Sequence, residues 1–349
     1  MKILSPAGSF KSGLAAIDAG ADAIYLGMRD ISHQRSRCSN FSRKELAKLK
    51  KLASLKNIEI NVTFNSSYNQ KNFDSISDNL SFLESISIDA VIVSDLGLVN
   101  LINKNYPKLK IVFSVQGQCG NTDFADIIKK YGVSKLVLDR NISIKEAKDI
   151  KEKTGLEVEM FAFGFQCYSQ DSICYMGDYF ANEPCNVQCS QKVKFLDTES
   201  KHRFFFMKYQ SCLNFIPEMI ESGIDYIKIE GRQRSSKYVF EITKIFREAI
   251  NSYKLNPKSY AVNPRWMKKL KSQSYGFEIT DGFYVENKYT REIISNPSLE
   301  NIFLYSKDIA LSFFDTGNIN KIRKEFQNAI KIQLSSPDKE KKHSFSDIK

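Results

Sequence analysis

Four of the seven cysteines in this chain of 349 residues are bunched in one short stretch, at Cys167, Cys174, Cys185 and Cys189. Thiolates are soft ligands, and four of them suit either zinc or an iron–sulfur cluster. Structural zinc usually takes cysteine pairs that are two to four residues apart, and only Cys185 and Cys189 have that spacing. The pattern therefore favours an iron–sulfur cluster, with zinc or a set of buried free thiols as the alternatives.

The other three cysteines are Cys38, Cys119 and Cys212. Cys212 opens a helix-like segment, and it is the reserve ligand if Cys185 or Cys189 does not bind. A packing role in the core is the stronger interpretation for Cys212. Cys38 and Cys119 follow predicted strands, where a packing role is again favoured.

A second group of candidate residues follows the predicted strand at 226–229. Strand alternation places Lys228, Glu230 and Arg232 on one face, where they can bind a carboxylate-bearing small molecule. Asp95 and Gln116, each after another predicted strand, are candidates to join that substrate site. The alternative is a buried ion-pair network that supports the fold.

The elements that position these residues alternate regularly along the chain. Apolar segments of strand length precede amphipathic segments of helix length, and the near-continuous apolar runs indicate parallel strands buried on both faces. Eight such units predict an α/β fold, a (β/α)8 barrel of the TIM type, with a doubly wound open sheet as the alternative. The strands are expected at Ile3–Ala7, Ala23–Gly27, Ile58–Phe64, Ala90–Ser94, Ile111–Val115, Leu136–Leu138, Val158–Phe163 and Tyr226–Ile229.

The joints between helices and strands repeat a short pattern. A glycine closes the helices at Gly20, Gly132, Gly155 and Gly223, as glycines at helix C-termini do. The segments Gly20–Ala23, Ser87–Ala90 and Gly223–Tyr226 all place an aspartate just before the strand.

We expect the barrel to span residues 1–255, including a cysteine-rich, cluster-binding insertion at 165–222 after the seventh strand. This insertion starts at the carboxyl ends of the strands, where barrel active sites form. A small C-terminal extension is expected at 256–334, and a charged, disordered tail at 335–349.

The formal net charge of the chain is +11. Such a charge can attract nucleic acid, but the basic residues are dispersed, and drift in composition is the simpler explanation. The sequence contains no apolar stretch long enough for a membrane span and no signal-peptide pattern, so a cytoplasmic location is expected.

Several of these segments together resemble a known family. Glu159-x-Phe161-x-x-Gly164-x-x-Cys167, followed by Cys174, resembles the signature of the collagenase-like peptidases, with departures at Phe165 and Ser172. Further matching segments are Ser5–Gly8, Gly20–Gly27, Ser114–Gln116, Phe161–Gly164 and Lys228–Ser235. The likeness is greatest to the branch of that family that serves ubiquinone biosynthesis.

This resemblance implies a 4Fe–4S cluster on Cys167, Cys174 and Cys185, and we infer Cys189 as the fourth ligand. It also implies a heterodimer with a UbiV-like sister protein. The pair would hydroxylate a prenylated phenol without O2, with prephenate as the oxygen donor.

Three other functions stay open at this point. Members of the same family resemble RNA base hydroxylases, and the chain is basic. A non-catalytic subunit, stabilised by its cluster, is a second alternative. A collagenase-like peptidase is the weakest, because the sequence contains neither a His-Glu-x-x-His zinc motif nor a Gly-x-Ser-x-Gly nucleophile motif.

Overall fold

The computed structural model describes residues 1–29, 38–66, 68–167, 192–194, 201–203 and 208–285. By its internal contacts the chain divides into two units. The larger unit comprises 1–186 and 207–285, and the smaller comprises 187–206 and 286–349. Within the smaller unit, β8 (Lys192–Lys194) and β9 (Lys201–Arg203) form an antiparallel pair. The domain boundaries expected at 255, 256–334 and 335–349 stay predictions.

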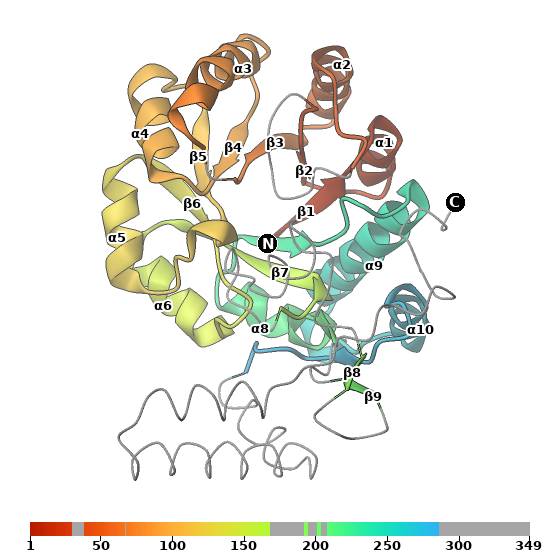
Figure 1. Cartoon of the computed structure of the whole chain (residues 1–349). Coiled ribbons are helices and arrows are strands. Elements are labelled where there is room, and N and C mark those ends of the chain that lie inside the picture. The colour runs from red at the N-terminus through yellow and green to blue at the C-terminus, as the bar shows by residue number, and fades with distance from the viewer. Residues whose placement is uncertain (30–37, 67, 168–191, 195–200, 204–207, 286–349) are drawn as a thin grey trace. The chain divides into compact units, whose positions relative to one another are not determined.

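The larger unit is built on a closed barrel of eight parallel strands (Figure 1). Each strand pairs with the next in sequence, and β11 closes the barrel by pairing with both β7 and β1. The predicted TIM-like (β/α)8 fold is therefore confirmed, and the open-sheet alternative is wrong. The strands are β1 (Lys2–Ala7), β2 (Ala23–Leu26), β3 (Glu59–Phe64), β4 (Ala90–Val93), β5 (Lys110–Phe113), β6 (Val133–Val137), β7 (Glu157–Phe165) and β11 (Tyr226–Ile229).

Helices surround these strands (Figure 1). Their amphipathic sequences bury one apolar stripe against the sheet, as surface helices of barrels do. They are α1 (Phe10–Asp18), α2 (Arg43–Ser54), α3 (Phe73–Ser85), α4 (Leu96–Asn105), α5 (Thr122–Lys130), α6 (Ile144–Thr154), α8 (Ile216–Glu221) and α9 (Ser236–Leu255). Short 3-10 turns, η1 (Gln70–Asn72) and η2 (Val115–Gly117), precede α3 and follow β5.

Residues at the end of the expected insertion and beyond it extend the barrel wall. β10 (Tyr209–Ser211) pairs antiparallel with the end of β7, and β12 (Ile279–Thr280) pairs with β10. η4 (Leu213–Phe215) leads into α8. After α9 the chain forms η5 (Pro257–Ser259) and α10 (Pro264–Gln273), and α10 packs against α9.

The barrel has two apolar layers that differ in composition. The larger layer lies between the strands and the helices. The smaller consists of strand residues that face the barrel axis, such as Leu4, Tyr25, Ile92, Val112 and Phe161. Buried polar residues share the interior with this smaller layer, so the centre of the barrel combines apolar and charged side chains.

The aspartate of each repeated joint, which lies just before one barrel strand, bonds to the first residues of the adjacent, preceding barrel strand. The aspartates accept backbone N–H bonds from Ile3, Ile60 and Val158, at 2.7, 2.7 and 2.9 Å. Each aspartate also pairs with a base from a surrounding helix, which is Arg247 for Asp22, Lys50 for Asp89 and Lys151 for Asp225. The predicted helix-ending glycines have φ of +86°, +89°, +68° and +75°, and Ser87 takes the same left-handed conformation at +55°.

Replacing Asp225 by alanine should lower the free energy of unfolding by about 2 kcal/mol, because the N–H of Val158 and the ammonium of Lys151 lose a charged acceptor. Urea unfolding measures this change. The control is Asp126→Ala, which removes an exposed carboxylate of α5. An equal loss in both variants would contradict a specific role for the joint.

The helices in the described part of the chain are neither long nor apolar enough to cross a membrane.

Candidate functional site

The candidate site lies at the carboxyl ends of the barrel strands. Cys167 follows β7 by two residues and is half-buried there, so the first predicted cluster ligand lies at the edge where barrel active sites form. The other three predicted ligands, Cys174, Cys185 and Cys189, lie outside the described residues. Among the residues that are described, no three His, Cys, Asp or Glu side chains converge as metal ligands would.

Aromatic rings pack around the strand end that carries Cys167. Phe165 contacts Tyr209 with ring centroids 4.3 Å apart, stacks on Tyr275 at 6.3 Å, and meets the edge of Phe277 at 5.5 Å. This packing fixes the direction in which the chain leaves β7.

The remaining described cysteines have different surroundings. Cys212 is completely buried in the layer between strands and helices, and its burial raises the pKa of the thiol. Burial likewise raises the pKa of Cys119 to about 11. Both side chains belong to the apolar layer between strands and helices, which supports packing roles for them. Cys38, which follows β2 in the chain, is half-buried. It lies near Gly8, which belongs to the loop after β1.

A buried ion triad occupies the barrel interior below the mouth. Glu159 on β7 has no exposed surface, and its Oε1 lies 2.9 Å from Nζ of Lys228 on β11. Its Oε2 lies 3.5 Å from Nζ of Lys135 on β6, which is also buried. Two cations thus share one carboxylate inside the barrel, so the triad has a net charge of +1.

The aromatic lining of the barrel offsets part of the cost of these charges. Nζ of Lys228 lies 4.5 Å from the ring centre of Tyr25, and Nζ of Lys135 lies 3.5 Å from that of Tyr226. Burial lowers the pKa of Lys228, and the charge of Glu159 opposes this effect.

The other two members of the predicted group lie above Lys228. Glu230 is partly exposed and pairs with Arg140 at 3.3 Å, and the guanidinium of Arg140 lies 3.7 Å from the ring centre of Phe161. Arg232 is buried and donates from Nη1 to the hydroxyl of Thr63 on β3, at 2.8 Å. The three predicted residues therefore follow one another from the interior to the mouth, each with a partner on another strand or loop.

The two remaining candidates take other positions. Asp95 accepts the backbone N–H of Leu98 at 2.9 Å and so caps the amino end of α4. Gln116 lies in η2, and its Oε1 is buried with no hydrogen-bond partner in the described part of the chain. Neither residue bonds to Lys228, Glu230 or Arg232 within the described ranges. Gln116 keeps a buried acceptor available for a ligand, whereas one oxygen of Asp95 is used to cap the helix.

Close backbone contacts connect the loops at the mouth. A Cβ atom on Gly8 would lie 1.7 Å from the carbonyl oxygen of Arg232, so the loop after β1 touches the loop after β11. A Cβ on Gly164 would lie 2.5 Å from Oε2 of Glu230. These contacts explain why the sequence has glycine at both positions.

Gly8→Ala should destabilise the barrel by about 3 kcal/mol, because the obstacle is a backbone carbonyl that cannot rotate away. Thermal unfolding measures this loss. The matched control is Gly120→Ala, where a Cβ would meet only Ile142 at 3.4 Å. A Gly8→Ala protein as stable as the control would contradict the contact.

Sequence reasoning omitted Lys135, Glu159 and Arg140 as site residues. The signal for Lys135 is a lysine in the middle of an otherwise apolar strand, and Glu159 is a carboxylate in the same situation. Buried charges in strands are paired as a rule, so each predicts a partner on a neighbouring strand.

The predicted group and its partners contain one more cation than carboxylates. Arg140, Arg232 and Lys228 contribute three cations, against the carboxylates of Glu159 and Glu230, while Asp95 caps α4. Such an arrangement suits an anionic ligand, and arginine can bind a carboxylate or phosphate through two parallel hydrogen bonds.

Comparison with known proteins places this barrel among named relatives. The model of Peptidase family U32 matches residues 8–294. The chain is 27% identical to the "tRNA hydroxylation protein P1" of Bacillus subtilis over 77% of its own length and 67% of that protein. It is 30% identical to an "Uncharacterized protease" of Methanocaldococcus jannaschii, over 81% of its length and 73% of the relative. It is also 25% identical to the "tRNA hydroxylation protein P2" of Bacillus subtilis, over 78% of its length and 93% of that protein.

Proposed function

Because the chain belongs to peptidase family U32, in which relatives are named tRNA hydroxylation proteins, we propose that it takes part in a hydroxylation without O2. The observation that carries the proposal is the pair of arginines, Arg140 and Arg232, at the same end of the barrel as Cys167. A hydroxylation without O2 requires an electron carrier and another source of oxygen. This site combines an expected redox centre with arginines that would bind an anionic oxygen donor.

The redox centre in this proposal is a 4Fe–4S cluster on Cys167, Cys174, Cys185 and Cys189. Thiolate ligands and the aromatic packing at Phe165 suit such a cluster, and Cys212 is too deeply buried to substitute easily. When bound, the cluster would supply or accept single electrons.

The chain's own charged residues would bind the oxygen donor. In our proposal Arg140 and Arg232 hold the carboxylates of a small donor such as prephenate at the mouth, above the Lys228 ammonium. Glu230 orients Arg140, and Glu159 orients Lys228 from below. Gln116, with its available buried acceptor, would bind a hydroxyl group of the ligand.

An RNA base is the acceptor that we favour. Two relatives carry tRNA hydroxylation in their names, and the net charge of +11 suits a polyanionic substrate. The second candidate is a prenylated phenol of ubiquinone biosynthesis. It is supported by the resemblance of the Lys228–Ser235 segment, which forms the end of β11 and the mouth loop around Arg232.

We also propose that the chain acts together with a similar protein. Ring hydroxylation would require a UbiV-like sister protein in a heterodimer. The two Bacillus subtilis relatives, P1 and P2, supply a precedent for two similar chains in one organism.

A deletion strain grown without oxygen tests the two acceptors together. Nucleosides from its tRNA and rRNA, and its quinones, would be measured by mass spectrometry against the parent strain. Loss of a hydroxylated nucleoside with normal quinone supports the RNA proposal, and the reverse result supports the prenylated phenol. Unchanged nucleosides and quinones would overturn the proposed hydroxylation.

A further inference from the structure

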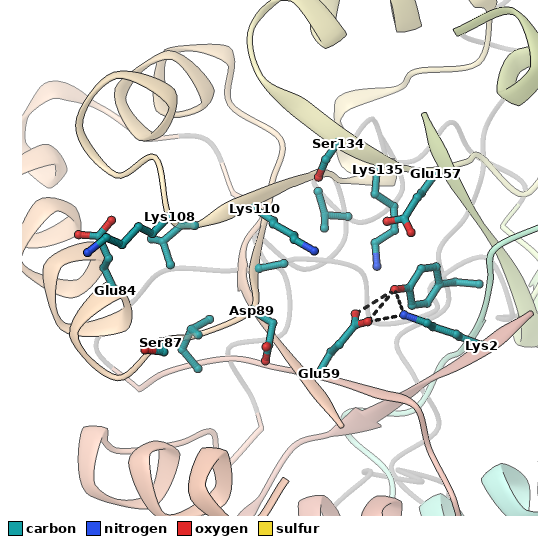
Figure 2. Close-up of a pocket in the computed structure, with 15 residues that line it drawn as sticks. Lys2, Glu59, Glu84, Ser87, Asp89, Lys108, Lys110, Ser134, Lys135 and Glu157 are labelled. Carbon is teal, nitrogen blue, oxygen red and sulfur yellow. Dashed lines mark hydrogen bonds and ion pairs between the residues drawn. The ribbon is translucent and has the colours of Figure 1, made fainter. Parts of the chain in front are cut away.

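A cavity of about 480 Å³ opens at the amino ends of the barrel strands, on the side opposite the mouth (Figure 2). Its walls come from the first residues of several strands and from the joint before β4. Its volume lies in the range of small-molecule pockets. The lining is strongly charged, with Lys2, Lys108, Lys110, Lys135, Glu59, Glu84, Asp89 and Glu157.

Some of these charges are already paired with each other or with residues behind the wall. Nζ of Lys2 lies 2.6 Å from Glu59, and the hydroxyl of Tyr226 donates to both oxygens of the same carboxylate at 2.9 Å. Burial would raise the pKa of Glu59, but the hydrogen bonds from Lys2 and Tyr226 outweigh it and lower that pKa. Asp89 is held by Lys50 and by the N–H of Ile60. This part of the wall is therefore fixed and internally neutral.

Lys135 is a buried cation of the cavity wall that shares its carboxylate with a second lysine. It is buried, and within the described ranges its ion-pair partner is Glu159, at 3.5 Å. Glu159 is closer to Lys228, at 2.9 Å, and makes its hydrogen bond there. The ring of Tyr226 covers one side of the Lys135 ammonium, and the cavity lies on another. A buried cation that shares its carboxylate is stabilised by any anion that reaches it.

Two further charges near Lys135 have no ion-pair partner in the described part of the chain. Lys110, from the start of β5, directs its ammonium toward the same space as Lys135, and Glu157, from the start of β7, stands beside them (Figure 2). At this end of the cavity two cations and one carboxylate therefore face the open volume, whereas Lys108 and Glu84 lie together at its other end (Figure 2). This pattern is complementary to a molecule with one carboxylate and one ammonium group.

We propose that this cavity binds a small zwitterion of the amino-acid class, with its carboxylate between Lys110 and Lys135 and its ammonium against Glu157. The site is separate from the mouth of the barrel and does not depend on the proposed hydroxylation. The fixed group of Lys2, Glu59 and Tyr226 forms its neutral floor.

Glycine and acetate are matched probes for this site, because they differ only in the ammonium group. Backbone amide spectra of the isotope-labelled full chain would be recorded during titration with each. We expect shifts at Lys110, Ser134, Lys135 and Glu157, with glycine binding about tenfold more tightly than acetate, the worth of one charged hydrogen bond.

Variants then assign the contacts. Lys110→Ala should weaken both probes about tenfold, since an exposed charge that contacts the carboxylate is lost. Lys135→Met should abolish binding, and Glu157→Gln should remove the advantage of glycine over acetate. Lys130→Ala, which removes an exposed lysine of α5, is the control and should change neither. The proposal is overturned if the cavity amides do not respond, or if Lys110→Ala binds glycine as the parent chain does.

Discussion

Cys167→Ala protein is expected to purify without bound iron and sulfide, whereas the parent chain, prepared without air, should contain about four irons. Cys167 is the predicted ligand whose position the structure describes, half-buried two residues beyond β7. A 4Fe–4S cluster needs four thiolates, and loss of one that is fixed to a rigid strand should release it. Iron and sulfide analysis, with the visible absorption spectrum, measures the loss.

The fold should survive this change, because Cys167 lies at the barrel edge and outside both apolar layers. Unchanged far-ultraviolet circular dichroism would show that cluster loss is not a consequence of unfolding.

Cys212→Ala and Cys119→Ala are the matched controls. Each removes one buried thiol whose pKa is raised by burial, and each should keep its full iron content. Iron loss in Cys212→Ala with retention in Cys167→Ala would reverse the ligand assignment. A colourless parent protein that contains stoichiometric zinc would replace the cluster by the zinc alternative.

The barrel could be predicted from sequence because its signals are local. Glycines at helix ends need only their own left-handed conformation, and at Gly20, Gly132, Gly155 and Gly223 the structure has it. The aspartates of the three joints are also visible in the sequence, and each binds the start of the neighbouring strand.

The site was less predictable because its contacts are long-range. Alternation along β11 places Lys228 and Glu230 on one face, but it does not identify Glu159 or Arg140 as their partners. The Lys228–Glu159 pair depends on the register between β7 and β11, which shifts at Lys228 and Ile229, and Arg140 comes from the loop after β6. The two interpretations of the group, substrate site and ion-pair network, are compatible, since each residue has a protein partner and the set still carries excess positive charge.

Asp95 illustrates the limit of strand-end reasoning. A polar residue after a parallel strand is equally well placed to cap the following helix, and Asp95 makes that bond with Leu98. Gln116, one strand further along, follows a strand in the same way but keeps a buried acceptor without a partner in the described ranges. Sequence spacing alone cannot separate the two cases.

Glu159→Gln is expected to destabilise the barrel at pH 7 by about 4 kcal/mol, the usual cost of leaving a buried charge without its counter-ion. In this variant Lys135 and Lys228 remain buried in the interior, and among the described residues neither has another carboxylate within ion-pair distance. Chemical unfolding of parent and variant measures the difference.

This loss should depend on pH in a defined direction. Burial already lowers the pKa of Lys228 below its ordinary value, and the Glu159 charge is the main influence that opposes this. In Glu159→Gln the pKa of Lys228 falls further. At pH values between this lowered pKa and the ordinary lysine pKa, the unfolded chain therefore binds more protons than the folded chain. Stability then rises with pH in this window, and the deficit of Glu159→Gln should shrink as the pH is raised from 7 toward 10.

A second substitution separates the buried charges from the loss of a hydrogen bond. Lys228→Met in the Glu159→Gln background removes the cation that lies closest to the missing carboxylate, so part of the lost stability should return. The shrinking of the deficit with pH should also weaken in the double variant, because Lys228 no longer titrates. Lys228→Met can also be made in the parent chain. If it lowers stability as much in the Glu159→Gln background as in the parent chain, the two residues are not coupled. In that case the triad is not the electrostatic centre of the barrel.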